Sequence, residues 1–205
     1  MQRHWDNFLD CAGAERRWQL PGLSKTVDQT KMSDPTPKKT GRVFLVGAGP
    51  GDPRLLTLRA VECLEAADLV VYDYLVPPEL LDHAQGARHI AARSLAGSHA
   101  ERHAQIQAIL IDAASKGQNA VHLKGGDPWL FGRGGDEAAA LRAAGIEYEV
   151  VPGVTAALAA AACAGIPLSQ RGLASAVTFV TGHDCLEKSS PVDWQALARL
   201  PDTLA

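Results

Sequence analysis

The sequence predicts an α/β protein in which helices cover both faces of a mostly parallel sheet. Three observations support this prediction. Short apolar runs alternate along the chain with segments whose apolar residues recur at helical spacing. The strand-like runs are almost continuously apolar, as is typical of parallel strands buried on both faces. Glycines stand where the predicted helices end.

The first domain is predicted from residues 41–152. Its expected strands are residues 42–46, 69–72, 88–91, 120–123 and 147–151. Its expected helices are residues 58–67, 78–84, 106–117 and 136–144. Pro78 is tolerated in a first helical turn, and Gly117 and Gly145 are suited to helix ends. This order predicts a parallel five-stranded αβα domain.

A second unit is expected from residues 153–205. An alanine-rich helix over residues 155–164 is closed by Gly165, a strand follows at residues 176–181, and another helix spans residues 193–200. A further strand is expected to begin at residues 202–205. Because so short a segment cannot close an αβα layer, we expect a partial C-terminal αβα domain.

Residues 1–40 differ from the rest of the sequence. Residues 29–41 are polar and contain prolines, which predicts a flexible N-terminal extension. Met32 is a candidate start, with the preceding residues as an upstream addition. The alternative is a short docking element around Trp5, Phe8 and Trp18.

Composition excludes several classes of protein. The chain has 205 residues and a net charge of −3, so it is not a broadly basic nucleic-acid binder. It has no apolar run of membrane-spanning length, and its first residues lack the apolar region of a signal peptide. The four cysteines form no CxxC pair, which indicates reduced thiols in a cytoplasmic protein. His99 and His103 have the spacing of a metal pair, but no third ligand is patterned nearby, so no metal is expected.

The first glycine loop, residues 47–52, begins like a dinucleotide-binding fingerprint. Asp52 stands where the third glycine belongs, and Pro50 has no N–H to donate to a phosphate. The loop therefore favours contact with an uncharged part of a ligand. A tight β–α turn without a ligand is the alternative.

Asp73 directly follows the strand at residues 69–72. Ligands of open α/β sheets bind beyond the carboxyl ends of the strands, so this carboxylate is placed to act as a base or to bind a ribose hydroxyl. The alternative is that Asp73 caps the following turn.

A second glycine loop follows the strand at residues 120–123. Gly125 and Gly126 allow a ligand close to the backbone, and Asp127 adds a negative charge. Arg133 offers a guanidinium for a carboxylate, and Asp136 is placed to orient it or to accept a hydrogen bond from a ligand N–H. The alternative is a solvated turn with Asp136 as the N-cap of the next helix.

The turn at residues 151–156 links the two predicted units. Thr155 is suited to N-cap the alanine-rich helix. Its hydroxyl and the backbone of Ala156 are also placed to line a cleft between domains, where ligands commonly bind.

Together these motifs resemble the uroporphyrinogen-III C-methyltransferases of the tetrapyrrole methylase family. The resemblance rests on GRVFLVGAGPGDPRLLTLRA, VVYDYLV, LKGGDPWLFGRGGDE, VPGVTAALAAAACAGIPLSQRG and FVTGH, in this order. It implies the tetrapyrrole-methylase fold, S-adenosyl-L-methionine as methyl donor with S-adenosyl-L-homocysteine as product, and a homodimer. It also implies conversion of uroporphyrinogen III to precorrin-2 via precorrin-1, towards sirohaem, cobalamin or haem d1.

The resemblance also assigns roles to residues. It implies Asp73 as proton acceptor. The positions that match the family's cofactor contacts are Pro50, Gly125, Gly126, Asp127, Leu130, Thr155 and Ala156. We expect Arg133, Asp136 and Arg171 to contact the carboxylate-rich substrate, because its negative charges need cationic partners.

The sequence departs from the family pattern at several positions. Arg93 is the nearest counterpart of a lysine that is the proposed proton donor in the family, and an arginine is a poor acid. His122 stands where arginine is usual, His103 where glutamine is usual, and Gln170 where histidine is usual. The family's Tyr-Met-Gly strand does not follow Leu204, so we expect a C-terminally shortened form.

Three alternative functions are distinguished from this one. The first is a methylase of a later precorrin. The second is a degenerate, non-catalytic module that binds S-adenosylmethionine. The third is a nicotinamide oxidoreductase, suggested by Gly47, Gly49 and Asp73 but opposed by Pro50 and Asp52.

Overall fold

The computed structural model describes residues 41–181 and 192–205, and the expected N-terminal extension lies outside these residues. The main element is a five-stranded parallel sheet in the order β3-β2-β4-β1-β5. Its strands are β1 (Val43–Gly47), β2 (Leu69–Tyr72), β3 (Arg88–Ala91), β4 (Ala120–Lys124) and β5 (Tyr148–Val151). The prediction of a parallel α/β fold is therefore confirmed.

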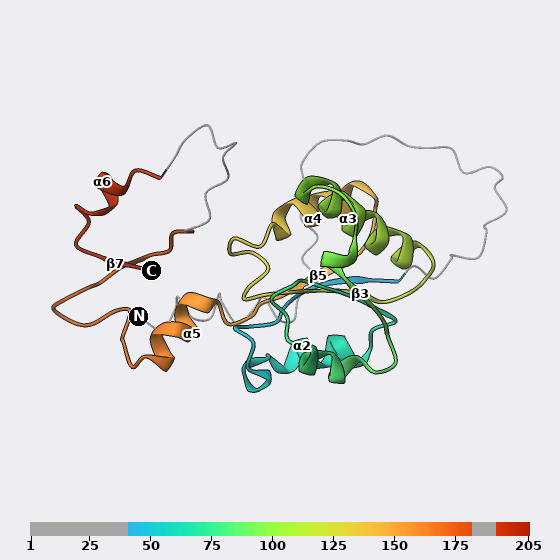
Figure 1. Ribbon diagram of the computed structural model, residues 1–205, viewed down its shortest axis with the longest axis horizontal. Helices are drawn as coiled ribbons and strands as arrows, with labels where there is room; N and C mark the ends of the chain where they lie inside the picture. Colours follow the sequence, from blue (N-terminus) through green and yellow to red (C-terminus); the bar gives the residue numbers. More distant parts are fainter. Residues whose placement is uncertain (1–40, 182–191) are drawn as a thin grey trace, which may run out of the picture. The chain divides into compact units, whose positions relative to one another are not determined.

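Helices cover both faces of this sheet, as Figure 1 shows. One buried cluster joins Val46, Val70 and Leu123 to α2 (Leu58–Glu65) and to the 3₁₀ helix η4 (Pro78–Ala84). The other joins Val43, Leu45 and Val71 to α3 (His99–Ser115) and α4 (Gly134–Ala143). The residues that alternate along each strand thus enter opposite cores, which explains why the strands read as continuous apolar runs.

The helices begin where the sequence offers caps. The hydroxyl of Thr57 accepts a hydrogen bond from the Ala60 N–H at the start of α2. Ser98 and Glu101 form a reciprocal capping box at the start of α3. The helix α4 differs, because its N-cap is Arg133 in a left-handed conformation and its side chain makes no capping bond. The alternative of Asp136 as N-cap is wrong, since Asp136 lies in the first turn of the helix.

The strand order creates a topological switch point. From β1 the polypeptide moves outward to β2 and β3, whereas from β4 it crosses to β5 on the other side of β1. The neighbouring strands β1 and β4 therefore send their connections in opposite directions. In open α/β sheets such a point opens a crevice at the carboxyl ends of the strands, where ligands bind.

The segment after β5 contains shorter elements than the sequence predicts. These are α5 (Ala156–Cys163), β6 (Val177–Thr178), α6 (Trp194–Leu197) and β7 (Thr203–Leu204). The strand expected near residues 202–205 is present as β7, which pairs in parallel with β6. Two other short 3₁₀ helices, η3 (Pro53–Leu55) and η5 (Ala92–Ser94), follow β1 and β3. No helix within residues 41–181 and 192–205 is long and apolar enough to cross a bilayer.

Candidate active site

Three glycine-containing loops meet at the carboxyl edge of β1, β4 and β5. Gly49 and Gly126 exchange backbone hydrogen bonds of 3.1 and 2.8 Å. The carboxylate of Asp127 accepts hydrogen bonds from the backbone N–H of Trp129 at 2.8 Å and of Gly153 at 3.1 Å. Asp127 thus links the loop after β4 to the loop after β5 while its own side chain stays half-buried.

Two kinds of glycine build this junction. A Cβ atom on Gly47 would lie 2.6 Å from the Cα of Gly153, so close backbone packing requires glycine there. Gly126 has a φ of +65°, and a Cβ there would meet only Thr155 and Ala156, both at 3.8 Å. Glycine at 126 is therefore favoured by the backbone conformation, and a Cβ there would make only ordinary contacts with Thr155 and Ala156.

The loop after β1 presents Pro50 to solvent. Asp52 is used locally, because its carboxylate caps η3 by accepting from the Arg54 N–H at 3.0 Å. Its Oδ2 also pairs with the Arg54 guanidinium at 2.6 Å. These bonds lower the pKa of Asp52 to about 2, and the carboxylate is paired with Arg54 within the loop. The expectation that the loop is not a dinucleotide site stays a prediction.

Asp73 lies at the same edge, at the end of β2. Its backbone N–H donates to the Leu123 carbonyl at 3.0 Å, which fixes it beside β4. Its Oδ1 lies 3.3 Å from Nε2 of His122, and about a third of its side chain (32%) remains exposed. His122 thus holds the carboxylate through Oδ1, and the side chain keeps exposed surface at the carboxyl ends of the strands.

Behind Asp73 lies a group that we call the buried charge cluster: Asp73, His103, His122, Lys124 and Glu137. His122 and Lys124 alternate with Val121 and Leu123 along β4, so they point to the face covered by α3 and α4. Those helices contribute His103 and Glu137.

Glu137 is the centre of this cluster and is fully buried. Its Oε1 lies 2.8 Å from Lys124 Nζ and 3.3 Å from His103 Nε2. Its Oε2 lies 3.1 Å from His122 Nδ1, in a close ionic contact without hydrogen-bond alignment. Such a charge is tolerated inside a protein only with partners of this kind.

Burial and pairing act in opposite directions on these groups. Burial raises the pKa of Asp73 and of Glu137, but the bonds and charges of His122 and Lys124 outweigh it, so both pKa values lie below the ordinary range. Burial lowers the pKa of His122, but the two carboxylates outweigh it and raise that pKa. Burial dominates at His103, whose pKa is lowered. The two carboxylates of the cluster thus face Lys124 and the His122 ring, whose pKa they raise.

Sequence reasoning missed this cluster, although it noted His103 and His122 as departures from the family. A signal was present, because a histidine and a lysine in an apolar run that is buried on both faces require partners. Glu137 also stands four residues before the buried Leu141, and His103 stands three before the buried Ile106. Such helical spacing predicts that both side chains face the core.

The loop between Asp127 and α4 contains two non-glycine residues in the left-handed region. They are Phe131 with φ of 58° and Arg133 with φ of 55°. Backbone strain of this kind concentrates at ligand-binding loops. Both side chains are exposed, and Arg133 Nη1 lies 3.3 Å from His99 Nδ1. Asp136 is also exposed, one turn into α4.

Thr155 occupies the N-cap position of α5, but its hydroxyl makes no capping bond. Thr155 is thus the N-cap residue that the sequence suggested, but without the side-chain hydrogen bond, and its Cα would lie 3.8 Å from a Cβ on Gly126. Ala156, the first residue of α5, is exposed, and Leu130, in the loop after β4, is half-buried.

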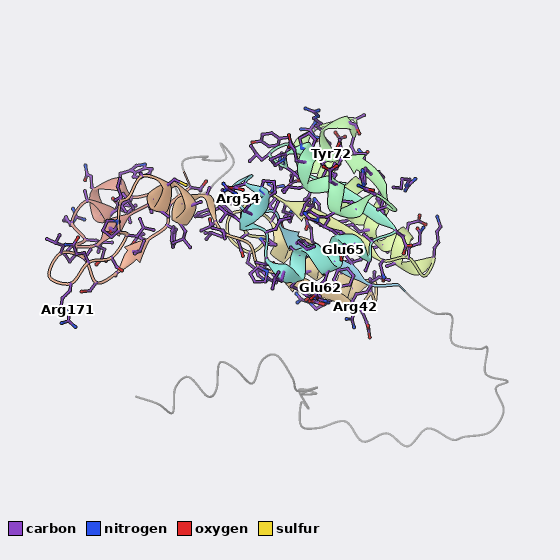
Figure 2. All side chains as sticks on the ribbon, turned by 90° about the horizontal axis from the view of Figure 1, so that it is seen from below. Arg42, Arg54, Glu62, Glu65, Tyr72 and Arg171 are labelled. Atoms are coloured by element: carbon purple, nitrogen blue, oxygen red, sulfur yellow. The ribbon has the colours of Figure 1, made fainter. Side chains whose placement is uncertain are left out.

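Two arginines predicted to be site residues, Arg93 and Arg171, lie outside the junction of the three glycine loops. Arg93 is exposed on η5 after β3, the strand at one edge of the sheet. Arg171 lies in a tight turn closed by hydrogen bonds between Gln170 and Ala174, and its side chain points away from the ribbon (Figure 2). The described contacts connect Arg171 to that turn and not to the glycine loops.

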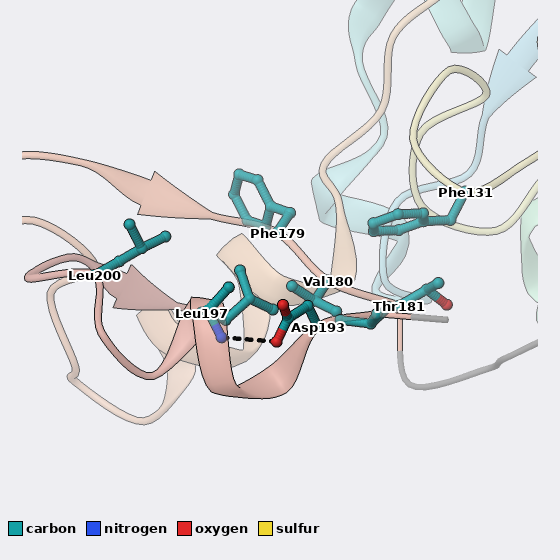
Figure 3. Close-up of a pocket in the computed structure, with 9 residues that line it drawn as sticks. Phe131, Phe179, Val180, Thr181, Asp193, Leu197 and Leu200 are labelled. Atoms are coloured by element: carbon teal, nitrogen blue, oxygen red, sulfur yellow. Dashed lines mark hydrogen bonds between the residues drawn. The ribbon is translucent and has the colours of Figure 1, made fainter. Parts of the chain in front are cut away.

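A separate apolar pocket of about 390 Å³ lies in the C-terminal segment. Figure 3 shows Phe179, Leu197 and Leu200 among its lining residues, with Phe131 at its border. Within residues 41–181 and 192–205, no group of three histidine, cysteine, aspartate or glutamate residues is placed to hold a metal ion.

Comparison with known proteins identifies the family to which this sequence and fold belong. The family model described as tetrapyrrole (corrin/porphyrin) methylases matches residues 42–205. A siroheme synthase from Baumannia cicadellinicola is 52% identical over 99% of this chain and 44% of its own length. An S-adenosyl-L-methionine-dependent uroporphyrinogen III methyltransferase from Methanosarcina barkeri is 48% identical over 80% of this chain and 65% of its own length. The match to the siroheme synthase thus extends over the N-terminal residues as well.

A solved structure agrees with these matches. The uroporphyrin-III C-methyltransferase of Thermus thermophilus, complexed with S-adenosylhomocysteine, is 43% identical, with a TM-score of 0.63. That likeness covers 78% of this chain and 67% of the Thermus chain. Our chain spans less than half the length of the siroheme synthase that it matches. The family match over residues 42–205 and the parallel sheet with its three glycine loops agree, and the chain belongs to the tetrapyrrole (corrin/porphyrin) methylases.

Proposed function

We propose that this protein methylates ring carbons of uroporphyrinogen III, using S-adenosyl-L-methionine as the methyl donor, and forms precorrin-2 via precorrin-1. The observation that carries this proposal is the position of Asp73, a partly exposed carboxylate at the same sheet edge as the three glycine loops. The similar Methanosarcina barkeri and Thermus thermophilus proteins bear the names of this activity.

The junction of the three loops fits the methyl donor. Gly126 with its positive φ, the N-cap residue Thr155 and the exposed Pro50 lie on the loops proposed to contact it. Asp127 places a carboxylate beside a ligand that carries a positive sulfonium. Gly125, Gly126, Asp127, Leu130, Thr155, Ala156 and Pro50 are the proposed cofactor contacts.

When bound, S-adenosylmethionine supplies an electrophilic methyl group, which the π electrons of a pyrrole carbon attack as the carbon–sulfur bond breaks. One proton must then leave the macrocycle. Asp73 is the proposed acceptor, because it is ionised, held at the edge and still reachable from solvent. Arg93 remains a cation and would contribute a charge in place of a proton.

The substrate carries carboxylates around a flat ring system. Arg133 stands exposed on a strained loop near the exposed aromatic rings of Trp129 and Phe131, an arrangement suited to a carboxylate and an apolar ring face. Asp136 and Arg171 are proposed as further substrate contacts. We also propose a homodimer, which exposed apolar residues such as Tyr74 and Leu75 support. We propose a cytoplasmic location, which the free thiols of Cys63 and Cys163 support.

Mass spectrometry of an anaerobic incubation with both substrates tests the function. We expect two added methyl groups per tetrapyrrole. One added methyl group on a precorrin substrate, with none on uroporphyrinogen III, would favour a methylase of a later step. Calorimetric binding of S-adenosylhomocysteine without any turnover would favour a non-catalytic module. Neither binding nor turnover would refute the proposal.

A matched pair of variants tests the residue roles. Asp73→Asn should retain S-adenosylhomocysteine binding and lose at least about 100-fold in turnover. Asp127→Asn should weaken binding of S-adenosylmethionine, because it removes the negative charge beside the sulfonium site, and should weaken binding of S-adenosylhomocysteine less, because its thioether is neutral. Asp112→Asn, on the exposed face of α3, is the control and should change neither quantity.

A further inference from the structure

The imidazole of His122 connects the surface carboxylate of Asp73 to the buried carboxylate of Glu137. Its Nε2 lies 3.3 Å from Asp73 Oδ1, and its Nδ1 lies 3.1 Å from Glu137 Oε2. Only 1% of the His122 side chain is exposed. The two ring nitrogens are thus held against carboxylates with almost no access from solvent.

This geometry determines the charge of the ring. A neutral imidazole has one N–H and one lone pair, so one carboxylate would face a lone pair at close range. A protonated ring has an N–H at both nitrogens: Nε2 is hydrogen-bonded to Asp73, and the Nδ1 side brings positive charge within 3.1 Å of Glu137. Charge balance agrees, because Lys124 alone cannot neutralise both Asp73 and Glu137.

We propose that protonated His122 is a positioning residue that holds Asp73 in the ionised, edge-facing state, with Glu137 and Lys124 fixing His122 from behind. This inference rests on the proposed role of Asp73 as proton acceptor. His122 itself does not touch the macrocycle, because Asp73 lies between the buried ring and the edge of the sheet.

The surrounding elements make His122 the group whose protonation changes. The groups that face it are Asp73 after β2, Lys124 on β4 and Glu137 on α4, and His103 on α3 reaches Glu137 from the other side. Lys124 keeps its contact with Glu137 in either state of His122. Loss of the His122 proton therefore leaves one N–H for two carboxylates and removes the positive charge that Asp73 faces.

The proposal predicts a reciprocal titration that does not depend on turnover. In ¹⁵N-histidine and ¹³C-carboxyl NMR of the full chain, His122 should remain protonated above the pH at which exposed histidines titrate. Asp73→Asn should move the His122 midpoint to lower pH, and His122→Gln should move the Asp73 midpoint to higher pH. Unchanged midpoints in both variants would overturn the proposal.

Kinetics supplies the second readout. We expect turnover to fall as pH rises through the His122 midpoint, and His122→Arg should abolish that fall because a guanidinium keeps its charge. His122→Gln should lower kcat by about 100-fold, as expected of a misplaced catalytic group, with S-adenosylhomocysteine binding unchanged. The control is His89→Gln on β3, where His89 Nε2 lies 2.9 Å from the Ala84 carbonyl and outside the buried charge cluster.

The outcomes separate this inference from the proposed function. If Asp73→Asn keeps full turnover, the role of Asp73 is wrong and the positioning role falls with it. If Asp73→Asn is inactive but His122→Arg keeps the alkaline fall, only the positioning role is wrong. If His122→Gln does not fold, the His122 midpoints of the unmodified chain and of Asp73→Asn still test the positioning role, and equal midpoints would overturn it.

Discussion

Two groups of charged residues, one inside the molecule and one on its surface, have similar contact distances but differ in burial. The buried charge cluster has partners at 2.8–3.3 Å around a glutamate with no exposed surface. The surface charge cluster, which consists of Arg42, Arg59, Glu62, Glu147 and Glu149, has closest contacts of 2.7–3.0 Å, but its side chains are 32–74% exposed.

Charge balance is what differs between them. The surface charge cluster has two arginines and three glutamates and tolerates the excess negative charge, because water screens it. The buried charge cluster can tolerate no such excess, so a histidine must carry a proton to balance it. We therefore expect burial, and not contact distance, to determine how much free energy of unfolding is lost when one charge is removed.

Removing one charge from the buried charge cluster should produce the largest effect on stability. Lys124→Met leaves Glu137 without its closest partner, and we expect the free energy of unfolding to fall by about 3–5 kcal/mol. Urea unfolding measures this loss. Lys116→Met, which breaks an exposed pair with Asp112, is the matched control, and we expect a change below about 0.5 kcal/mol. Equal effects in the two variants would contradict the comparison.

The pH dependence of stability should come next, and its sign differs between the groups. The folded pKa of His122 is raised above 6.5, so its contribution is complete below that value and is lost as pH rises through the folded pKa. The folded pKa values of Asp73 and Glu137 are lowered below 3.8 and 4.5, so their contributions are present above these values and are lost as pH falls through the folded pKa.

Unfolding in urea at a series of pH values checks this prediction. We expect the free energy of unfolding to have a maximum between the pH at which the carboxylate contributions are lost and the pH at which the His122 contribution is lost. His122→Arg should remove the loss of stability at alkaline pH and leave the loss at acid pH. An alkaline loss that persists in His122→Arg would assign it to another group.

The strained loop between Asp127 and α4 lets stability be separated from binding. Arg133→Gly relieves a left-handed backbone, and we expect it to stabilise the protein by about 0.5–1 kcal/mol while it weakens tetrapyrrole binding. Thermal unfolding and substrate titration measure the two effects. Arg142→Gly, at the end of α4 with helical geometry, is the control and should destabilise by about 1 kcal/mol. Destabilisation by Arg133→Gly would show that the loop stores no strain.

Sequence reasoning reached the fold because the elements of the first domain are locally coded. The five apolar runs became five parallel strands, with boundaries shifted by only a residue. It failed where partners are distant in sequence. Glu137 reads as a helix-surface acid until α4 is placed over β4, and Arg133 gives no local sign of its left-handed conformation. The roles of the proposed site residues stay predictions, because they depend on ligands.

The smallest effect is expected in the surface charge cluster, despite its better geometry. Arg59 donates two bonds of 2.8 Å to Glu149 and one of 2.7 Å to Glu62, and its guanidinium lies 5.9 Å from the Phe44 ring centroid. Glu149→Gln removes one charge but keeps the shape, and we expect a loss of about 0.2–1 kcal/mol that largely disappears in about 1 M salt. Urea unfolding at two salt concentrations measures it. A loss as large as that of Lys124→Met, or one that salt leaves unchanged, would mean that contact geometry and not burial decides the strength of these charge clusters.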